Sequence, residues 1–404
     1  MGTYPVGERG SYKEEAPAEG GLTPAQVNSI LHKLVSLYET KVYPGISFVL
    51  MRKGKVLLSR GLGFSHGHGP GDHPQAERRE MRPDTPVCLF STSKAVTATV
   101  VHTLHEQGAL DINRRVAEYV PEFGKSGKAD ITVADVLGHR AGFSGFTRKG
   151  MSSEIFDFDH VVRVLCEQRA ELHTKGAVAY HAVTGGYILA EVVKRTTGKD
   201  IRHALHKLIK EPLGFEWFDY GAPGKDISKV AQNYVTGWPN VFPFTQLVEY
   251  AIGSSFETIV GLSRDERFYD SIVPSANMVA TAPEVAQFFQ MLLNGGELNG
   301  KRILKEETVR AMTRETGNTW FDRRLMMPMR YSQGFMLGNS PLGLYGPGYK
   351  AGVRPPGFHE YSLLGRPAER YLRRAAQHRQ EPRRQARAGF CRPVAHHRRR
   401  MCVR

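Results

Sequence analysis

The stretch that decides the fold is residues 87–104, VCLFSTSKAVTATVVHTL. It opens with a short apolar run, Val87 to Phe90, which can bring the chain up from a buried core. Apolar residues at helical spacing follow Lys94, and Gly108 supplies a C-terminal stop for that helix. The pattern predicts a buried run, a turn and a buried helix, with a serine held between them.

Ser91 and Lys94 lie three positions apart where this helix is expected to begin. Residues at this spacing share a helix face, so the Lys94 amine can approach the Ser91 hydroxyl, and a helix N-terminus favours negative charge. Such an arrangement makes a nucleophile of an ordinary serine. Ser-x-x-Lys also occurs by chance, and the alternative interpretation is that Ser91 is simply the helix N-cap.

Four separate segments of the sequence carry a family pattern. They are residues 89–123, 131–143 (ITVADVLGHRAGF), 180–198 (YHAVTGGYILAEVVKRTTG) and 274–296 (PSANMVATAPEVAQFFQMLLNGG). With these segments in this order, the chain resembles the serine β-lactamase and penicillin-binding protein superfamily, specifically the class C β-lactamase branch that includes β-lactamase-fold carboxylesterases. Several matches in the family's order are more specific than one motif.

The resemblance implies an α/β plus all-α fold, in which an antiparallel sheet is flanked by helices and carries a large helical insertion. Local patterns agree with that order of elements. Residues 45–51 and 55–61 read as a hairpin that turns at 52–54. Capping boxes at Thr23 and Thr281 predict one helix before the hairpin and another over residues 285–293.

The resemblance also implies that Ser91, Lys94 and Tyr180 are the catalytic residues. The class C branch carries a Tyr-x-Asn element, and Tyr180-His181-Ala182 stands at that place. Tyr180 then accepts the proton of Ser91, directly or with Lys94, because a phenol with an ordinary pKa of about 10 needs a nearby cation to hold its anion. The alternative interpretation of Tyr180 is a core tyrosine with one hydrogen bond. We expect His181 to be a neighbour rather than a base.

Ala182 departs from the family's Asn, whose amide is expected to bind the acyl-amide carbonyl of a β-lactam. The resemblance therefore favours a small ester or lactone as substrate. A β-lactamase or D-amino-acid peptidase is one alternative, and a non-catalytic binding or scaffold protein of the same fold is another. We expect no cofactor and no metal, because the histidines at 66, 68 and 73 lie in a Gly/Pro-rich loop rather than a fixed tetrahedral arrangement.

Composition sets the outer limits. The chain has 404 residues, 41% hydrophobic and 24% charged, which is typical of a globular protein. It has no run of 18 apolar residues and no basic-then-apolar leader pattern, so we expect cytoplasmic residence and no membrane partner. We expect residues 1–22 to be disordered, residues 23–350 to form the β-lactamase-like hydrolase domain, and its helical subdomain to span about residues 110–280.

The net charge of +15 is concentrated at the C-terminus. Residues 351–404 hold fourteen Arg, no Lys and three Glu, a net charge of +11, which leaves +4 for the first 350 residues. A basic tail can bind phosphate without specificity, so a nucleic-acid binder is a third alternative, but we expect no specific nucleic-acid partner.

The same tail departs from the family's ending. Lys350-Ala351-Gly352 mimics the family's Lys-Thr-Gly element, but Pro355 and Pro356 follow, and proline cannot serve a central strand. A one-nucleotide shift with permitted codons from Lys350 onward instead yields a His-x-Gly element and two apolar strands. We therefore predict that a frameshift has replaced the native ending, that the C-terminal strands are missing, and that this chain has low or no activity.

Overall fold

The computed structural model describes residues 13–143, 145, 152–170, 176–237, 244–317 and 321–338. Contacts divide the chain into two units, Met1–Leu363 and Leu364–Arg404, and every described residue belongs to the first. Lys350 and the predicted frameshifted ending therefore lie outside the described residues. Within the described ranges, no helix is long and apolar enough to cross a membrane.

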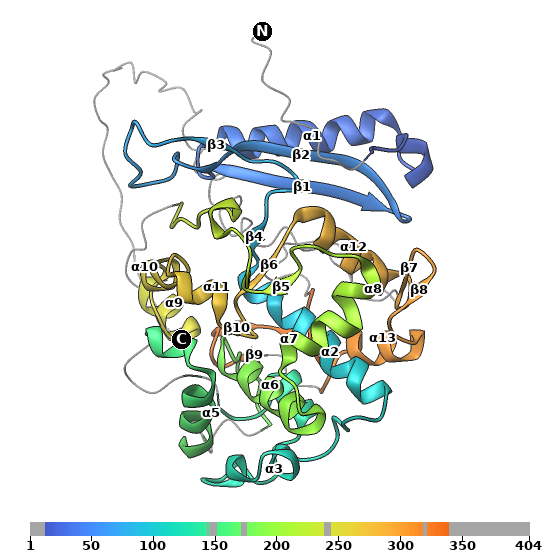
Figure 1. Ribbon diagram of the computed structural model, residues 1–404. Helices are drawn as coiled ribbons and strands as arrows, with labels where there is room; N and C mark the ends of the chain where they lie inside the picture. The colour runs from blue at the N-terminus through green and yellow to red at the C-terminus, as the bar shows by residue number, and fades with distance from the viewer. Residues whose placement is uncertain are drawn as a thin grey trace, which may run out of the picture. The chain divides into compact units, whose positions relative to one another are not determined.

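An antiparallel three-stranded sheet forms one layer, shown in blue in Figure 1. Its order is β1-β2-β3, with β1 at Gly45–Arg52, β2 at Lys55–His66 and β3 at Arg79–Glu80. Lys53 and Gly54, with φ of 52° and 74°, connect β1 to β2. Two residues with positive φ are typical of the hairpin turn that matches strand twist, so the predicted hairpin is confirmed.

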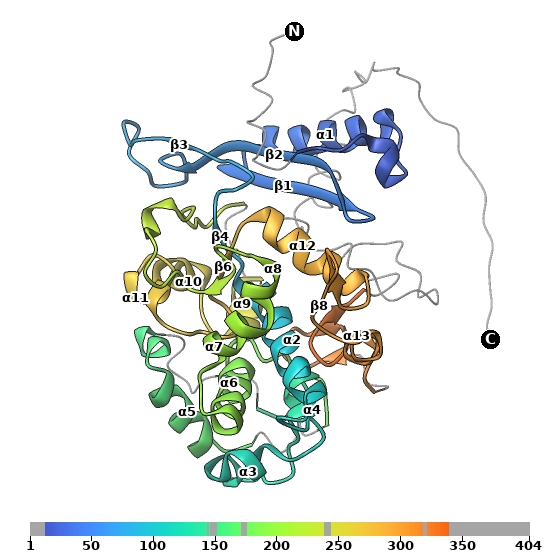
Figure 2. The same cartoon turned by 45° about the vertical axis from the view of Figure 1, so that its right-hand side comes forward.

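Helices cover both faces of this sheet. Figures 1 and 2 show α1 (Pro24–Glu39) on one side and α12 (Ala282–Leu293) on the other. Both begin at the capping boxes expected from the sequence: Thr23 pairs with Gln26, and Thr281 pairs with Glu284. The Gln290 side chain of α12 also accepts the N–H of Gly54 at 3.2 Å, which ties the hairpin turn to this helix.

The N-terminal segment differs from the expectation of disorder through Leu22. Residues 17–20 form a 3-10 turn, η1, and the preceding residues contact β2. The Glu15 N–H donates to the Val56 carbonyl at 2.8 Å, and the Glu14 carboxylate pairs with the buried guanidinium of Arg60. These contacts with β2 hold the segment in place, and the composition of the segment alone does not predict them. Residues 1–12 lie outside the described ranges.

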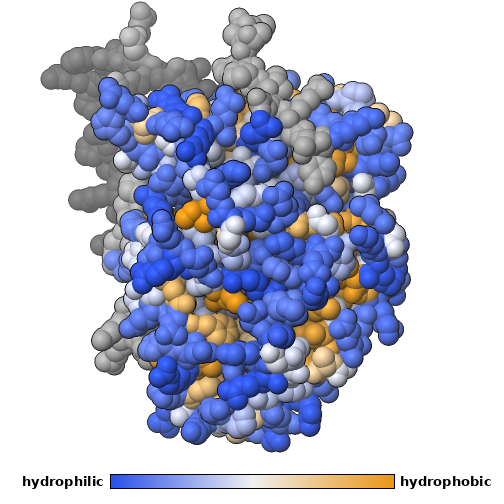
Figure 3. Space-filling view, in the orientation of Figure 1, coloured by the Kyte–Doolittle hydropathy of each residue, from blue (hydrophilic) through white to orange (hydrophobic). Residues whose placement is uncertain are grey.

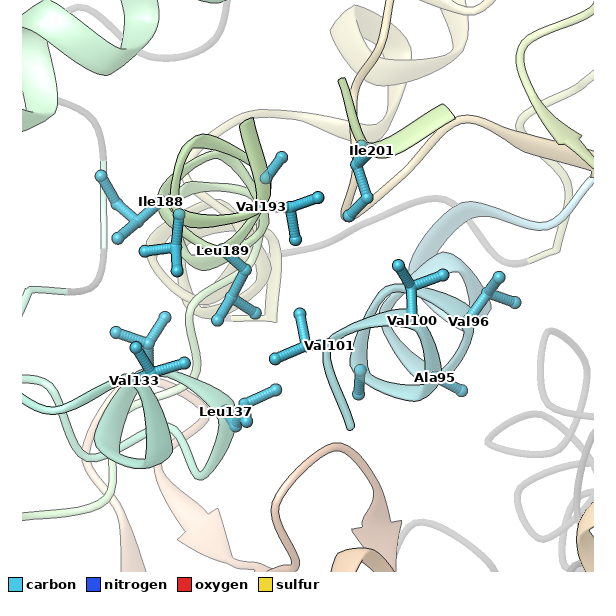
Figure 4. Packing of buried hydrophobic residues seen from close by; sticks show 14 of the residues in the cluster. Ala95, Val96, Val100, Val101, Val133, Leu137, Ile188, Leu189, Val193 and Ile201 are labelled. Atoms are coloured by element: carbon cyan, nitrogen blue, oxygen red, sulfur yellow. The ribbon is translucent and has the colours of Figure 1, made fainter. Parts of the chain in front are cut away.

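The second layer is helical and contains the main hydrophobic core. Figure 4 shows Val101, Leu137 and Leu189 pointing into the space between α2, α4 and α6. Branched and small apolar side chains at helical spacing make this possible, and Val100, Val101 and Ile188 are fully buried. The helices of this layer are α2 (Ser93–Glu106), α3 (Val116–Tyr119), α4 (Val133–Leu137), α5 (Phe158–Glu167), α6 (Thr184–Thr197), α7 (Ile201–Leu205), α8 (Glu211–Leu213), α9 (Phe244–Ile252), α10 (Phe256–Leu262), α11 (Glu266–Asp270) and α13 (Glu306–Thr313).

Short strands and turns connect these helices. A second antiparallel sheet, ordered β4-β6-β5, joins Val87–Cys88, Met278–Ala280 and Asp219–Tyr220. The remaining strands form two-residue pairs: β7 (Glu297–Leu298) with β8 (Lys301–Arg302), β9 (Phe321–Asp322) with β10 (Met327–Pro328), and β11 (Arg330–Tyr331) with β12 (Met336–Leu337). The short helical turns are η2 (Phe90–Thr92), η3 (Pro121–Gly124), η4 (Ser153–Phe156), the π-helical η5 (His206–Lys210) and η6 (Ile227–Lys229).

The expected architecture is therefore present: a sheet between helices, with a large helical region inserted between the hairpin and α12. The view in Figure 3 shows a largely hydrophilic face with hydrophobic residues in small, separate groups.

Candidate active site

The Ser91 hydroxyl lies on a strained turn between the small sheet and α2. The chain leaves β4, passes Phe90 at a φ of +42°, and forms η2 before α2 begins at Ser93. A bulky residue at positive φ is uncommon and costs conformational energy, which surrounding contacts must hold in place. Ser93 Oγ supplies such contacts, because it donates to the Phe90 carbonyl at 2.5 Å and accepts the Met278 N–H at 3.0 Å.

This geometry contradicts the alternative interpretation of Ser91 as the N-cap of the helix. The N-cap of α2 is Thr92, and it makes no side-chain capping bond. Ser91 is exposed, whereas residues 95–104 of α2 are buried. An exposed hydroxyl on a turn anchored to a buried helix is available to a substrate and fixed in position.

Lys94 lies beside Ser91 on the first turn of α2. Its Nζ donates to Ser91 Oγ at 3.2 Å and to the main-chain carbonyl of Ser275 at 3.1 Å. The same ammonium lies 5.0 Å from the centre of the Tyr180 ring. The lysine therefore contacts the hydroxyl and the face of the phenol together, which places positive charge where a serine or tyrosine anion would form.

Tyr180 approaches Ser91 from the loop before α6. Its Oη donates to Ser91 Oγ at 2.9 Å, and the side chain is buried, with 5% of the residue exposed. The structure therefore brings together the three residues singled out from the sequence. A hydroxyl, an amine and a phenol within hydrogen-bond distance are the groups needed for a serine nucleophile and its proton acceptor.

Two histidines pack behind Tyr180, of which His181 is buried and His139 is half-buried. The His139 ring lies 5.1 Å from the Tyr180 ring, and its Nδ1 accepts the main-chain N–H of His181 at 3.0 Å. The His181 ring stacks on Phe143 with centroids 4.9 Å apart. His181 is therefore a packing neighbour in this structure, and its hydrogen bond to the site passes through its main chain.

Burial keeps these histidines uncharged near neutral pH. It lowers the pKa of His181 to about 3, with the positive charge of Lys94 acting in the same direction. Burial also lowers the pKa of His139 well below its ordinary value, and His181 and Lys94 add to this effect. The Lys94 ammonium therefore faces neutral imidazoles rather than competing cations.

A small cavity of about 30 Å³ adjoins the Lys94 side chain. Among the residues lining it are Lys94, His139, His181 and Ser275, together with Gly186. Gly186 is needed here because a Cβ would come within 2.3 Å of Ser275 Oγ, which accepts the Gly186 N–H at 3.1 Å. The start of α6 can therefore approach the Ser275 loop closely, and that loop presents its carbonyl to Lys94.

Sequence reasoning missed three contributors to this site: Ser275, His139 and Asp322. Ser275 and His139 fall inside matched segments, but nothing in the sequence marks a main-chain carbonyl or a ring contact. Asp322 accepts the Tyr180 N–H at 3.3 Å from a strand of only two residues, where no alternation can be read.

The third family element, predicted to be lost after Lys350, lies outside the described residues. Within those residues, no group of three or more His, Cys, Asp or Glu side chains is arranged to hold a metal ion.

Comparison with known sequences identifies the relatives. The family model described as Beta-lactamase matches residues 31–372. The esterase/beta-lactamase LipL of Mycobacterium tuberculosis is 32% identical over 281 residues, which make up 66% of this chain and 64% of that protein. The chain thus spans less than two thirds of the length of this curated relative.

Comparison with solved structures gives the same result. A family VIII carboxylesterase is similar with a TM-score of 0.65 and 30% identity, covering 78% of this chain and 81% of that one. EstA from Arthrobacter nitroguajacolicus Rue61a is similar with a TM-score of 0.66 and 26% identity, covering 82% and 84% of the two chains.

The family match extends over most of the chain and includes the turn with Ser91, the start of α2 and the loop with Tyr180. The architecture and the order of the four segments agree with it. The chain belongs to the β-lactamase family, within the serine β-lactamase and penicillin-binding protein superfamily.

Proposed function

We propose that this chain is a serine hydrolase that forms an acyl-enzyme on Ser91, with small esters or lactones as substrates. The observation that carries the proposal is the position of Ser91 Oγ, 2.9 Å from Tyr180 Oη and 3.2 Å from Lys94 Nζ. Nucleophile and base within hydrogen-bond reach of each other are the signature of covalent catalysis by a hydroxyl.

In the proposed acylation step, the Ser91 O–H bond breaks as the Oγ–carbon bond forms with the substrate carbonyl. The proton passes to Tyr180 Oη in its phenolate form, which Lys94 stabilises by its charge. The phenol then gives the proton to the departing alcohol as the ester bond breaks. In deacylation, water attacks the acyl carbon and gives a proton to the phenolate. The bond between the acyl carbon and Ser91 Oγ then breaks, and the phenol returns the proton to Ser91 Oγ as the acid leaves.

The contacts of the site support this division of roles. Ser91 is exposed and can meet a substrate, whereas Tyr180 is buried and held beside Lys94. Because Lys94 also donates to the Ser275 carbonyl, its ammonium is held between a fixed acceptor and the reacting hydroxyl. A positioned charge is more effective than a mobile one, since little reorganisation is needed during the reaction.

The substrate proposal rests on Ala182 and on the relatives. Ala182 places a buried methyl group where the family's Tyr-x-Asn element has an amide, so a donor or acceptor for a β-lactam amide is lacking at that position. The similar proteins include one named esterase/beta-lactamase and one titled a carboxylesterase. We therefore rank esters and lactones above β-lactams and D-amino-acid peptides.

We also propose that this exact chain has low activity. If the frameshift has removed the third element, a backbone N–H of the oxyanion hole is lost with it. Losing one such donor costs about a hundredfold to a thousandfold in rate. We also keep cytoplasmic residence as a proposal, supported by the free and buried thiols of Cys88 and Cys166, which are usual in a reducing compartment.

The test is hydrolysis of p-nitrophenyl butyrate and of nitrocefin, measured side by side with Ser91→Ala as the control. Covalent labelling by a fluorophosphonate, located by mass spectrometry, reports on Ser91 even when turnover is slow. Both assays are run on this chain and on a version that carries the alternative translation after Lys350. We expect ester hydrolysis and labelling that both depend on Ser91. Nitrocefin turnover far above ester turnover would reverse the substrate ranking. The absence of labelling in both versions would favour a non-catalytic scaffold.

A further inference from the structure

A fully buried carboxylate lies behind the candidate active site, on the hairpin formed by β9 and β10. Asp322 is 0% exposed, and its two oxygens accept four hydrogen bonds. Oδ1 accepts the main-chain N–H groups of Arg324 at 2.7 Å, Leu325 at 2.8 Å and Tyr180 at 3.3 Å, and Oδ2 accepts the Tyr331 hydroxyl at 2.6 Å. A buried carboxylate is costly unless its lone pairs are used, and here they are.

The four bonds join three parts of the chain. Two of them close the turn of the hairpin that carries Asp322, and one reaches Tyr331 on β11. The fourth reaches Tyr180, 142 residues earlier in the chain. Asp322 therefore links the loop with the candidate base to the hairpin.

The neighbouring residue of that loop is held in a similar way. The His181 N–H donates to His139 Nδ1, and the His139 ring packs against the Tyr331 ring with centroids 4.7 Å apart. Two consecutive main-chain N–H groups are thus bound by two side chains from different elements. Tyr331 contacts both of these side chains, through its hydroxyl at Asp322 and its ring at His139.

We propose that Asp322 is the positioning residue for Tyr180, fixing the loop so that the phenol stays within proton-transfer distance of Ser91. The inference rests on the proposed function. Asp322 contacts the main chain of Tyr180, and the reacting Oη lies at the other end of that side chain, 2.9 Å from Ser91 Oγ. A shift of the loop therefore moves Oη, and a misplacement of about 1 Å can cost about a hundredfold in rate.

Two substitutions of Asp322 distinguish the effect of its hydrogen bonds from the effect of its negative charge. Asp322→Asn keeps an oxygen for the three main-chain N–H groups and presents its amide N–H to the Tyr331 oxygen. Asp322→Ala removes both acceptor oxygens and with them all four hydrogen bonds. We expect Asp322→Ala to lower the rate of Ser91 labelling by a fluorophosphonate about a hundredfold, counted per folded molecule, and Asp322→Asn to stay within about threefold of the unmodified chain.

Glu284 provides a matched control. It is another buried carboxylate, and it accepts the main-chain N–H groups of Glu216 at 2.6 Å, Trp217 at 2.8 Å and Thr281 at 2.9 Å, away from Ser91. Glu284→Ala is expected to lower the melting temperature as Asp322→Ala does. Its labelling rate per folded molecule is expected to stay within about threefold, because no contact to Tyr180 is lost.

The decisive comparison uses Tyr180→Phe as a background. A residue that acts through the Tyr180 hydroxyl has little further effect once that hydroxyl is gone, so Asp322→Ala should slow labelling of Tyr180→Phe by less than about threefold. An equal loss in both backgrounds means that Asp322 supports the fold in general, and this result overturns the proposal.

A crystal structure of Asp322→Ala distinguishes this proposal from the proposed function. We expect the distance from Tyr180 Oη to Ser91 Oγ to lengthen from 2.9 Å beyond hydrogen-bond range. An unchanged distance refutes the positioning role, whatever the activity. A lengthened distance in a chain whose Ser91 is never labelled supports the positioning role and rejects the hydrolase.

Discussion

Replacing Tyr180 by Phe tests the site with the smallest change that removes its chemistry. The ring keeps its position against His139 at 5.1 Å and against Lys94 at 5.0 Å, because both contacts involve the ring rather than the hydroxyl. The phenol oxygen donates a hydrogen bond to Ser91 Oγ at 2.9 Å. The variant therefore removes one oxygen atom at the point of the proposed proton transfer.

The expected size of the loss follows from this role. General acid–base catalysis by a positioned side chain contributes about a hundredfold to ten-thousandfold in rate. At 25 °C this range equals about 2.7 to 5.4 kcal/mol of activation free energy. The loss of one hydrogen bond costs about 1 kcal/mol of folding stability, so the effect on catalysis should exceed the effect on the fold.

The assay measures kcat/KM for p-nitrophenyl butyrate and the rate of fluorophosphonate labelling at Ser91. Tyr187→Phe is the matched control, because Tyr187 is fully buried on α6 and donates its hydroxyl to the Ile155 carbonyl, away from Ser91. Both variants lose one phenol oxygen and one hydrogen bond. We expect a comparable loss of stability in the two and a large loss of rate only in Tyr180→Phe.

If kcat/KM and the labelling rate of Tyr180→Phe stay within about threefold of those of the unmodified chain, the reasoning is refuted, because the loss of a catalytic base lowers the rate much more than this. An equal loss of rate in Tyr187→Phe also refutes it, because the effect then follows the fold.

Lys94→Met keeps the aliphatic stem but removes the ammonium that contacts Ser91 Oγ, so Ser91 labelling should slow at least about a hundredfold; an unchanged labelling rate contradicts the role of the charge. Burial lowers the pKa of His102 to about 4 and that of His181 to about 3, both below the value of about 6.5 expected in the unfolded chain. The unfolded state therefore binds more protons below pH 6.5, and the free energy of unfolding should fall as pH drops from 6.5 towards 4, by up to about 1.4 kcal/mol per pH unit for each histidine. Urea titrations at pH 7 and pH 5 with equal midpoints would contradict this. Thr281→Ala removes the capping bonds of α12 and should cost about 1 kcal/mol in thermal unfolding, with the labelling rate per folded molecule unchanged. Sequencing of the coding DNA tests the frameshift, and codons that forbid the alternative translation after Lys350 reject it.

Local spacing in the sequence was enough to predict the contact between the site residues that lie close together along the chain. Ser91 and Lys94 are three residues apart, and the geometry of one helical turn is enough to predict their contact. Tyr180 is 89 residues from Ser91, and no periodicity links the two; only the family resemblance suggested the pair. The hairpin and the capping boxes were readable because their signals are local as well.

The remaining contacts depend on long-range packing. Asp322 lies on a two-residue strand, and Lys94 binds a main-chain carbonyl at Ser275 that every residue type possesses, so neither has a pattern. The N-terminal segment shows the same limit. Its polar composition indicated disorder, whereas the Glu14 carboxylate forms a partly buried ion pair with Arg60, 46 residues away.

The residues of the site lie far apart along the chain, and this separation affects when the site forms during folding. Ser91, Ser275 and Asp322 meet their partners across 89, 181 and 142 residues, respectively. Closing such long loops carries an entropic cost that nearby contacts avoid, so α2 can become helical well before its neighbours arrive. A nascent or partly opened chain then displays helical circular dichroism without a competent nucleophile. Reactivity towards a covalent probe is therefore a late marker of maturation, and it reports on completed assembly more strictly than secondary structure does.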